Sequence, residues 1–291
     1  MRKEELKRLI VQKKSFLCIG LDSDIERIPG FLKNSCDDPQ FEFNRRIVDA
    51  TIDLAVAYKP NTSFYESRGS KGWRSLEKTI HYIKEHPGGP VFTIADAKRG
   101  DIGNTSAQYA KAFFVHLPFD AITLNPYMGH DVVQPFLDYP GKWAILLGLT
   151  SNPGATDFQV LQPQFPLLLE KLGIKTCYWK KLYELVMEES MKWGTTENTM
   201  FVVGATQTSM LAAIRDNVPD HFFLIPGVGA QGGDLKSIVE KTLNKDIGIL
   251  VNSSRDILFA SAEKNFDEKA REAAAKLQQE MSVILKEKKL A

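Results

Sequence analysis

Eight short apolar segments, each ending in polar or turn-forming residues, constrain the fold of this chain more than any other feature of its sequence. They cover residues 16–22, 54–61, 91–98, 120–126, 143–151, 200–206, 222–228 and 247–254. Continuous runs of Val, Ile, Leu, Phe and Ala are typical of strands that are buried on both faces, as in a parallel sheet. The sequence therefore predicts eight parallel strands.

The segments between these strands have helical periodicity. Three sets of apolar residues each fall on one helix face: Leu76 with Ile80 and Ile83, Met210 with Leu211 and Ile214, and Leu235 with Ile238 and Val239. Strands that alternate with helices imply βαβ crossovers, and eight such units in about 250 residues are typical of a TIM (β/α)8 barrel. A doubly wound sheet usually has fewer strands and a Gly-rich turn after the first one, where this chain has GLDSDIER. We therefore predict an α/β fold of the TIM-barrel class.

One domain is expected to span residues 1–291, because the chain contains no low-complexity segment and no obvious linker. Two regions depart from a minimal barrel. Residues 152–180, which include QPQFP, are interpreted as a surface insertion between the fifth and sixth strands. Residues 261–289 have apolar positions near helical spacing and predict a long amphipathic helix that packs on the barrel.

The overall charge argues against several classes of partner. The chain has 37 basic and 36 acidic residues and a formal net charge of +1, which predicts no nucleic-acid partner and no membrane anchor.

Three cysteines without a CxxC pair make a disulfide framework or a structural zinc site unexpected. The five histidines lack HxH or HExxH spacing, so no metal site is predicted. The first 20 residues lack the apolar core of a signal peptide, and we expect a cytoplasmic protein.

Charged side chains close several of the predicted strands. Asp22 follows the first strand, Lys59 and Asn61 close the second, and Asp96 and Lys98 close the third. In a TIM barrel the carboxyl ends of the strands carry the functional residues, and residues two apart on an extended strand face the same side. These charges are therefore candidates for an active site. The alternatives are an ion pair that caps a strand for Asp96 and Lys98, and a turn or helix cap for Asp22.

A second cluster follows the seventh and eighth strands. The segment PGVGAQGGD, residues 226–234, contains four glycines, among them Gly229, whose backbone N–H groups can approach a ligand closely. Arg255, in NSSRD after the eighth strand, adds a fork of donors suited to a phosphate. TIM barrels commonly bind phosphate at the loops after these two strands. The pattern therefore favours a phosphate site over a flexible glycine turn.

These motifs resemble the orotidine 5′-phosphate decarboxylase family, and the length of the chain resembles its longer, type 2 subgroup. DAKRGDIGNT (96–105) contains the DxKxxD signature, and GLD (20–22), AYKPN (57–61), LTSNPGA (149–155) and PGVGAQGGD (226–234) follow in the family's order. The resemblance covers roughly residues 16–256. It implies a homodimer of TIM barrels that converts orotidine 5′-phosphate (OMP) to UMP in pyrimidine biosynthesis, with no metal and no organic cofactor.

The resemblance also implies roles for individual residues. The catalytic set would be Lys59, Asp96 and Lys98 with Asp101 from the partner subunit, and Lys98 would protonate C6 of the pyrimidine. The substrate-binding set would consist of Asp22, Asn61, Thr105 of the partner, Ser151, Gly229, Gln231 and Arg255. Asp22 together with Lys59 of the catalytic set would contact ribose hydroxyls, Ser151 would contact the pyrimidine, and Gln231 and Arg255 would contact the phosphate. Arg99 should point away from the site by strand alternation.

Two other functions remain possible interpretations of the same residues. A sugar-phosphate decarboxylase or synthase of the same superfamily would share DxKxxD but would need Mg²⁺, which Lys59 would repel. A non-catalytic barrel that senses phosphate would bind ligands without turnover. Activity in the presence of EDTA would exclude the Mg²⁺-dependent enzyme, and any turnover of substrate would exclude the non-catalytic sensor.

Overall fold

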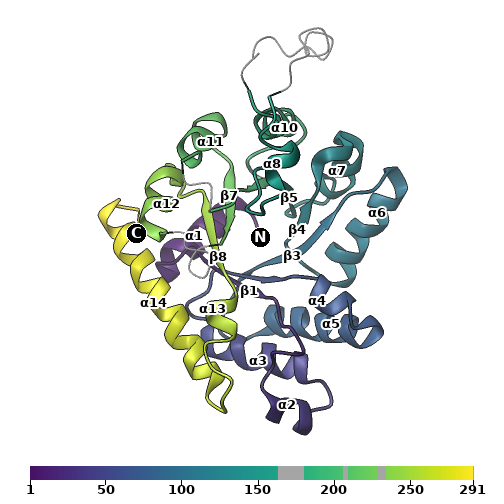
Figure 1. Ribbon diagram of the computed structural model, residues 1–291, viewed down its shortest axis with the longest axis vertical. Coiled ribbons are helices and arrows are strands. Elements are labelled where there is room, and N and C mark those ends of the chain that lie inside the picture. Colours follow the sequence, from purple (N-terminus) through teal and green to yellow (C-terminus); the bar gives the residue numbers. More distant parts are fainter. Residues whose placement is uncertain (163–179, 206–208, 228–233, 291) are drawn as a thin grey trace.

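The computed structural model describes residues 1–162, 180–205, 209–227 and 234–290. Eight parallel strands close into a barrel in chain order, and the last strand pairs with the first. The helices surround this barrel (Figure 1). The strands are β1 Leu17–Leu21, β2 Ala57–Pro60, β3 Phe92–Arg99, β4 Ala121–Leu124, β5 Trp143–Leu147, β6 Thr199–Val202, β7 Phe222–Pro226 and β8 Ile249–Ser253. The predicted α/β fold, a TIM barrel in one domain, is confirmed.

The observed strands coincide closely with the apolar segments of the sequence. Six lie inside the expected ranges, whereas β3 extends one residue further and β6 begins one residue earlier. Most strands are shorter than their segments because the polar residues at their ends leave the barrel as loops. Nearly every strand residue is buried, as expected for a sheet that is covered on one face by helices and filled on the other by side chains.

The helices carry the predicted apolar faces toward the barrel. Leu76, Ile80 and Ile83 are buried in α5, and Leu235, Ile238 and Val239 are buried in α12. The helices up to β5 are α1 Lys3–Lys13, α2 Gly30–Ser35, α3 Pro39–Thr51, α4 Ser63–Glu66, α5 Gly69–Glu85, α6 Gly103–Lys111, the π-helix η1 Ala112–His116, the 3₁₀ helix η2 Pro126–Met128 and α7 His130–Leu137. Those after β5 are α8 Ala155–Phe158, α10 Leu182–Ser190, α11 Leu211–Asn217, α12 Leu235–Thr242, α13 Arg255–Leu258 and α14 Phe266–Glu287.

The two regions that depart from a minimal barrel are described in part. Residues 163–179, most of the expected insertion, lie outside the described residues, and α8 covers its beginning. The C-terminal helix α14 begins at Phe266, five residues later than expected, and packs beside α3 and α13 (Figure 1). The Phe266 ring stacks on Phe43 of α3, with centroids 5.0 Å apart, which anchors the first turn of α14 to the barrel.

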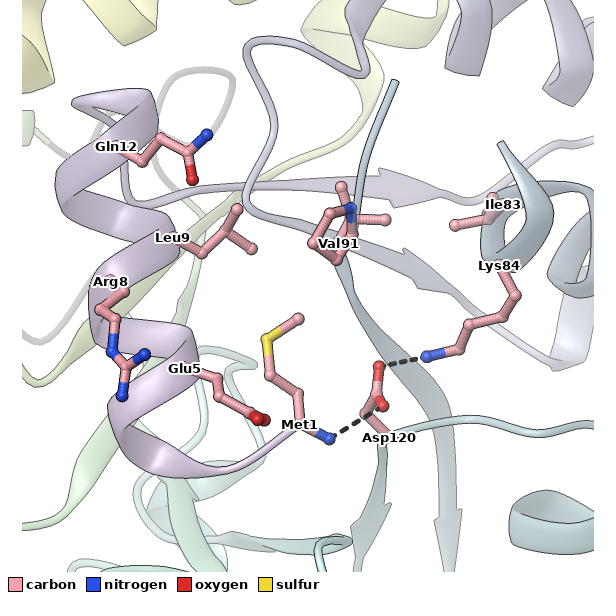
Figure 2. A pocket seen from close by; sticks show the side chains of 10 residues that line it. Met1, Glu5, Arg8, Leu9, Gln12, Ile83, Lys84, Val91 and Asp120 are labelled. Carbon is pink, nitrogen blue, oxygen red and sulfur yellow. Dashed lines mark hydrogen bonds and ion pairs between the residues drawn. The ribbon is translucent and has the colours of Figure 1, made fainter. Parts of the chain in front are cut away.

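Helix α1 and the loops that lead into the strands form the amino end of the barrel. There Asp120, just before β4, accepts hydrogen bonds from Lys84 and from both the backbone and the hydroxyl of Thr93. Figure 2 shows Asp120, Lys84 and Met1 at the edge of a cavity of about 480 Å³ beside α1. Burial raises the pKa of Asp120, but the Lys84 ammonium outweighs it and holds the pKa below its usual value. This end of the barrel therefore contains a satisfied buried carboxylate.

His221, at the entry to β7, predicts a pH dependence of stability. Its ring is buried against Phe201, and neither ring nitrogen has a hydrogen-bond partner among the described residues. Burial, together with nearby Lys3 and Arg215, lowers the pKa of His221 to about 4. Between pH 6.5 and 4 the unfolded chain therefore binds a proton that the folded chain does not, which lowers the free energy of unfolding by about 1.4 kcal/mol per pH unit.

The variant His221→Phe should lose this dependence. Urea unfolding at pH 7 and at pH 4.5 should show a smaller loss of stability for His221→Phe than for the wild type, by about 2–3 kcal/mol. The exposed His116 supplies a control, and His116→Gln should behave like the wild type. An identical acid sensitivity in His221→Phe and wild type would show that another group is responsible.

Among the described residues, no helix combines the length and apolar character needed to cross a membrane.

Candidate active site

Four charged side chains form a continuous chain at the carboxyl ends of β1, β2 and β3. Lys59 of β2 donates to Asp96 Oδ2 at 2.7 Å, and its ammonium lies 3.8 Å from Asp22 Oδ1. Lys98 donates to the other oxygen of the same carboxylate, Asp96 Oδ1, at 2.6 Å. Asp96 is therefore held between two lysines, and the four charges alternate in sign.

Burial and charge act against each other in this array. Burial would raise the pKa of Asp96, but the ammonium groups of Lys59 and Lys98 outweigh it and hold the pKa far below the usual value. Burial would lower the pKa of Lys59, but Asp96 and Asp22 raise it above its usual value. Lys59 is only 4% exposed, whereas the Lys98 side chain is 51% exposed. Lys98 is therefore the more accessible of the two cations of the array.

The backbone of β3 is distorted where it carries these charges. Ala95 pairs with Ile122 and Arg99 with Leu124, so Asp96, Ala97 and Lys98 all lie opposite the single residue Thr123. Lys98 has a φ of 47°, a left-handed conformation that is strained for a residue with a side chain. The Asp96 and Lys98 side chains meet, as predicted. They do so because a bulge redirects the side chains of β3, and not because of the simple alternation of an extended strand.

A small cavity of about 160 Å³ opens beside the array. It is lined by Asp22, Lys59, Asp96, Pro226, Gly227, Asn252, Ser253, Ser254, Arg255 and Asp256, which follow or end β1, β2, β3, β7 and β8. A Cβ on Gly20 would lie 1.8 Å from Ser254 Oγ, so glycine is needed there for the loop after β8 to close over β1. The tertiary structure thus joins the charged array to the Arg255 segment.

Some predicted residues lie apart from this cavity in the chain itself. The Asp101 carboxylate accepts from Ile102 N at 2.8 Å and forms no ion pair within the described ranges, and Thr105 is half-buried in α6. Asn61 Oδ1 accepts from the backbone and the hydroxyl of Ser63, which closes a turn after β2. The backbone of Ser151 packs against Gly204, beyond the end of β6. Gly229 and Gln231 lie outside the described residues.

Arg99 takes no part in the array, in agreement with the prediction. Its guanidinium forms an ion pair with Glu66 and lies over the rings of Tyr109 and Phe113, 5.4 and 5.5 Å from their centroids. This arrangement ties the end of β3 to α4 and α6.

Three kinds of site residue were not predicted from the sequence. Asn252, Ser254 and Asp256 line the cavity, and their position beside Arg255 was the available signal. Cys18 of β1 is buried below the array, where burial raises the pKa of its thiol to about 12. Thr123 contacts both Asp96 and Lys98, and the only signal was a hydroxyl within the otherwise apolar strand AITL.

Comparison with known proteins identifies relatives over almost the whole chain. The chain is 52% identical over 289 residues to a Flavobacterium johnsoniae protein named orotidine 5′-phosphate decarboxylase, covering 99% of this chain and 100% of that protein. The structure of Leishmania donovani OMP decarboxylase is similar, with a TM-score of 0.79, 34% identity and 98% of each chain covered. The structure of Leishmania donovani UMP synthase is also similar, with a TM-score of 0.79 and 35% identity. The match covers 97% of this chain and 55% of the UMP synthase chain.

A family model gives the same assignment. The model of the orotidine 5′-phosphate decarboxylase / HUMPS family matches residues 15–272, which include all eight strands and the charged array. The chain therefore belongs to the orotidine 5′-phosphate decarboxylase / HUMPS family.

Proposed function

We propose that this protein is an orotidine 5′-phosphate decarboxylase that makes UMP in pyrimidine biosynthesis. The bond between C6 of the pyrimidine and its carboxylate breaks, CO₂ leaves, and the electron pair remains on C6. Lys98 then gives a proton from Nζ to that carbon, which completes UMP. The observation that carries the proposal is the Lys59–Asp96–Lys98 array beside the cavity that Arg255 lines, in a chain of this family.

The array suits a reaction in which negative charge develops on carbon. The carbanion at C6 has little resonance stabilisation, so a preorganised cation beside it must lower the barrier. Lys98 is held by Asp96 at 2.6 Å and needs no reorganisation during the reaction. The ionised Asp96 carboxylate would lie near the leaving carboxylate of the substrate and would disfavour the bound ground state relative to the transition state. Lys59 keeps Asp96 ionised.

The remaining site residues would bind the rest of the substrate. Arg255 and Gln231 would hold the phosphate, with backbone N–H groups near Gly229 beside them. Closure of that loop would exclude water and use remote binding energy in the transition state. Asp22 and Lys59 would contact the ribose hydroxyls, Asn61 would lie near the ribose, and Ser151 would meet the pyrimidine. Lys59 within 3.8 Å of both carboxylates makes this array a poor site for Mg²⁺, the ion that the alternative sugar-phosphate chemistry requires.

The ultraviolet absorbance of OMP mixed with the purified protein tests the proposed reaction. With EDTA present throughout, we expect the absorbance change that accompanies conversion to UMP. A folded sample that leaves OMP unchanged would exclude the decarboxylase. Turnover of a sugar phosphate only after addition of Mg²⁺ would support the related synthase, and phosphate-ligand binding without any turnover would support a sensor. The cytoplasmic location remains a prediction.

The site is further proposed to be shared between the two subunits of a homodimer, with Asp101 and Thr105 reaching the partner's cavity. Three large apolar side chains support this proposal: Ile102, Tyr127 and Met128, which are 61%, 85% and 49% exposed. They follow β3 and β4, and the two loops lie together because Asn125 N donates to Arg99 O at 2.8 Å. An exposed apolar patch beside Asp101 is typical of a protein–protein contact.

Mixing two inactive variants should restore activity if the site is shared. Each site would take Lys98 from one subunit and Asp101 from the other. In a hybrid dimer of one Asp101→Asn subunit and one Lys98→Ala subunit, one site therefore contains both substitutions and the other site contains neither. Random exchange makes half of the dimers hybrids, so the mixture should regain on the order of a quarter of wild-type activity. The control is a mixture of Lys98→Ala with itself. Absence of recovery, after subunit exchange has been verified by mass spectrometry, would contradict a shared site.

A further inference from the structure

Thr123 of β4 lies directly beneath the charged array. Its hydroxyl donates to Asp96 Oδ1 at 3.2 Å and accepts from the backbone N–H of Lys98 at 2.9 Å. The residue is only 1% exposed, so no water competes for these two hydrogen bonds. The Thr123 hydroxyl thus connects the Asp96 carboxylate to the backbone of Lys98.

The bulge in β3 explains why this hydroxyl is needed. Three residues of β3 face Thr123 alone, so the ladder between β3 and β4 cannot pair every backbone group of the bulge. The N–H of Lys98 would otherwise be left without a partner, because the backbone pairing of β3 with β4 resumes only at Arg99. A buried unpaired N–H is costly, and the Thr123 hydroxyl removes that cost. It thereby stabilises the left-handed conformation at Lys98, whose φ is 47°.

The same hydroxyl also completes the hydrogen bonding of Asp96. Oδ2 accepts from Lys59, and Oδ1 accepts from Lys98 and from Thr123. With all three donors in place, the carboxylate has one orientation, and that orientation sets where Lys98 Nζ lies. Loss of the Thr123 donor would leave Asp96 oriented by the two lysines alone and would remove the tether on the Lys98 main chain at the same time.

We infer that Thr123 is a positioning residue, which acts through Asp96 and Lys98 and sets the placement of the Lys98 ammonium. The inference rests on the proposed function for its effect on rate, because only Lys98 is proposed to act on the substrate. Since small displacements of a catalytic group have large effects on rate, removal of the hydroxyl should lower kcat. KM should change little, because Thr123 does not line the cavity that contains Arg255.

Two substitutions at Thr123 and one matched control test this inference. Thr123→Val removes the hydroxyl with almost no change in shape, and Thr123→Ser retains it. Thr93→Val is the control, because the Thr93 hydroxyl of β3 makes the same two kinds of hydrogen bond. It donates to the buried Asp120 carboxylate at 2.9 Å and accepts from the backbone N–H of Asp120 at 3.1 Å. That pair is at the amino end of the barrel, where Figure 2 shows Asp120, and is remote from the array.

Steady-state kinetics with OMP should separate the three variants. We expect Thr123→Val to lower kcat by about tenfold to a hundredfold, with KM within about threefold of wild type. Thr123→Ser and Thr93→Val should remain within about threefold of wild-type kcat. A wild-type kcat in Thr123→Val would overturn the inference. An equal loss of kcat in Thr93→Val would also overturn it, since any buried hydroxyl would then have the same effect.

A crystal structure of Thr123→Val tests the inference independently of the reaction. We expect Lys98 to leave its left-handed conformation, or its Nζ to move away from Asp96 Oδ1. An unchanged Lys98 would overturn the positioning role even in an active enzyme. If the wild-type protein does not convert OMP, the proposed function fails, and the structure of the variant still decides whether Thr123 positions Lys98.

Discussion

Replacement of Lys98 by alanine is expected to abolish turnover of OMP almost completely while UMP still binds. The substitution removes both the proton donor and the cation next to C6. A general acid typically contributes 10²–10⁴-fold, and a preorganised electrostatic group about 10²–10³-fold. Together these effects predict a loss in kcat on the order of 10⁴-fold or more. Single-turnover assays of OMP measure the rate, and calorimetric titration measures the dissociation constant for UMP, which should change less than about tenfold.

The fold should survive this substitution. The Lys98 side chain is 51% exposed, and Asp96 retains Lys59 at 2.7 Å, so the free energy of unfolding should fall by no more than about 1 kcal/mol. Lys245→Ala is the matched control, since Lys245 forms a surface ion pair with Asp220 and lies in the loop before β8. Lys98→Arg retains the charge but holds its proton too tightly to donate it, so it should also be slow. Wild-type kcat in Lys98→Ala would exclude Lys98 as the proton donor.

Replacement of Lys59 by methionine should have the largest effect on stability. Lys59 is 4% exposed and forms an ion pair with Asp96, so its removal leaves the Asp96 carboxylate with the half-exposed Lys98 as its remaining cation. Breaking a buried ion pair from one side typically costs about 3–5 kcal/mol. Urea unfolding at pH 7 measures this loss, and kcat should fall as well because Asp96 loses the donor to its Oδ2 and then positions Lys98 less firmly.

The pH dependence of Lys59→Met gives the prediction a sign. In the wild type the pKa of Asp96 lies well below its ordinary value of 3.8, so its ionised form contributes its full stability above pH 3.8, and this contribution is lost progressively as the pH falls from 3.8 through the lower pKa of the folded state. Without Lys59 the pKa of Asp96 rises. The difference in stability between variant and wild type should therefore shrink below about pH 4.

A double variant controls for loss of packing. Lys59→Met/Asp96→Asn removes both charges of the buried pair and should recover most of the stability at pH 7, whereas it should remain inactive. If the double variant were no more stable than Lys59→Met, the effect would come from lost packing of the lysine chain and not from an unpaired carboxylate.

The fold was predictable because hydrophobic patterning acts locally. The runs at 222–228 and 247–254 are apolar on both faces, and the residues between them carry the helical spacing of Leu235, Ile238 and Val239. Eight repeats of this pattern leave few ways to bury all the strands. The start of α14 was less predictable, because Phe266 begins that helix by stacking on Phe43, a residue more than 200 positions away in the chain.

The candidate site was predictable in its residue types and less so in its geometry. Asp22, Lys59, Asp96 and Arg255 were expected at one rim, and they line one cavity. The roles of Asp101 and Thr105 depend on a second copy of the chain and remain predictions. Thr123 was not identified, because a single threonine in a buried strand is usually a core residue, and no local pattern indicates what lies opposite it on the neighbouring strand.

The sequence by itself therefore determined the barrel, the order of its strands and the set of charges at their carboxyl ends, because these follow from periodicity and chain connectivity. Only the tertiary structure decided how the charges are arranged. The bulge places three residues of β3 opposite Thr123, Lys98 adopts a left-handed conformation, and Asp96 lies between two lysines. The physical reason is that a buried charge or N–H group must find its partner in space, and in this barrel β2 supplies Lys59 for Asp96 and β4 supplies Thr123 for the N–H of Lys98.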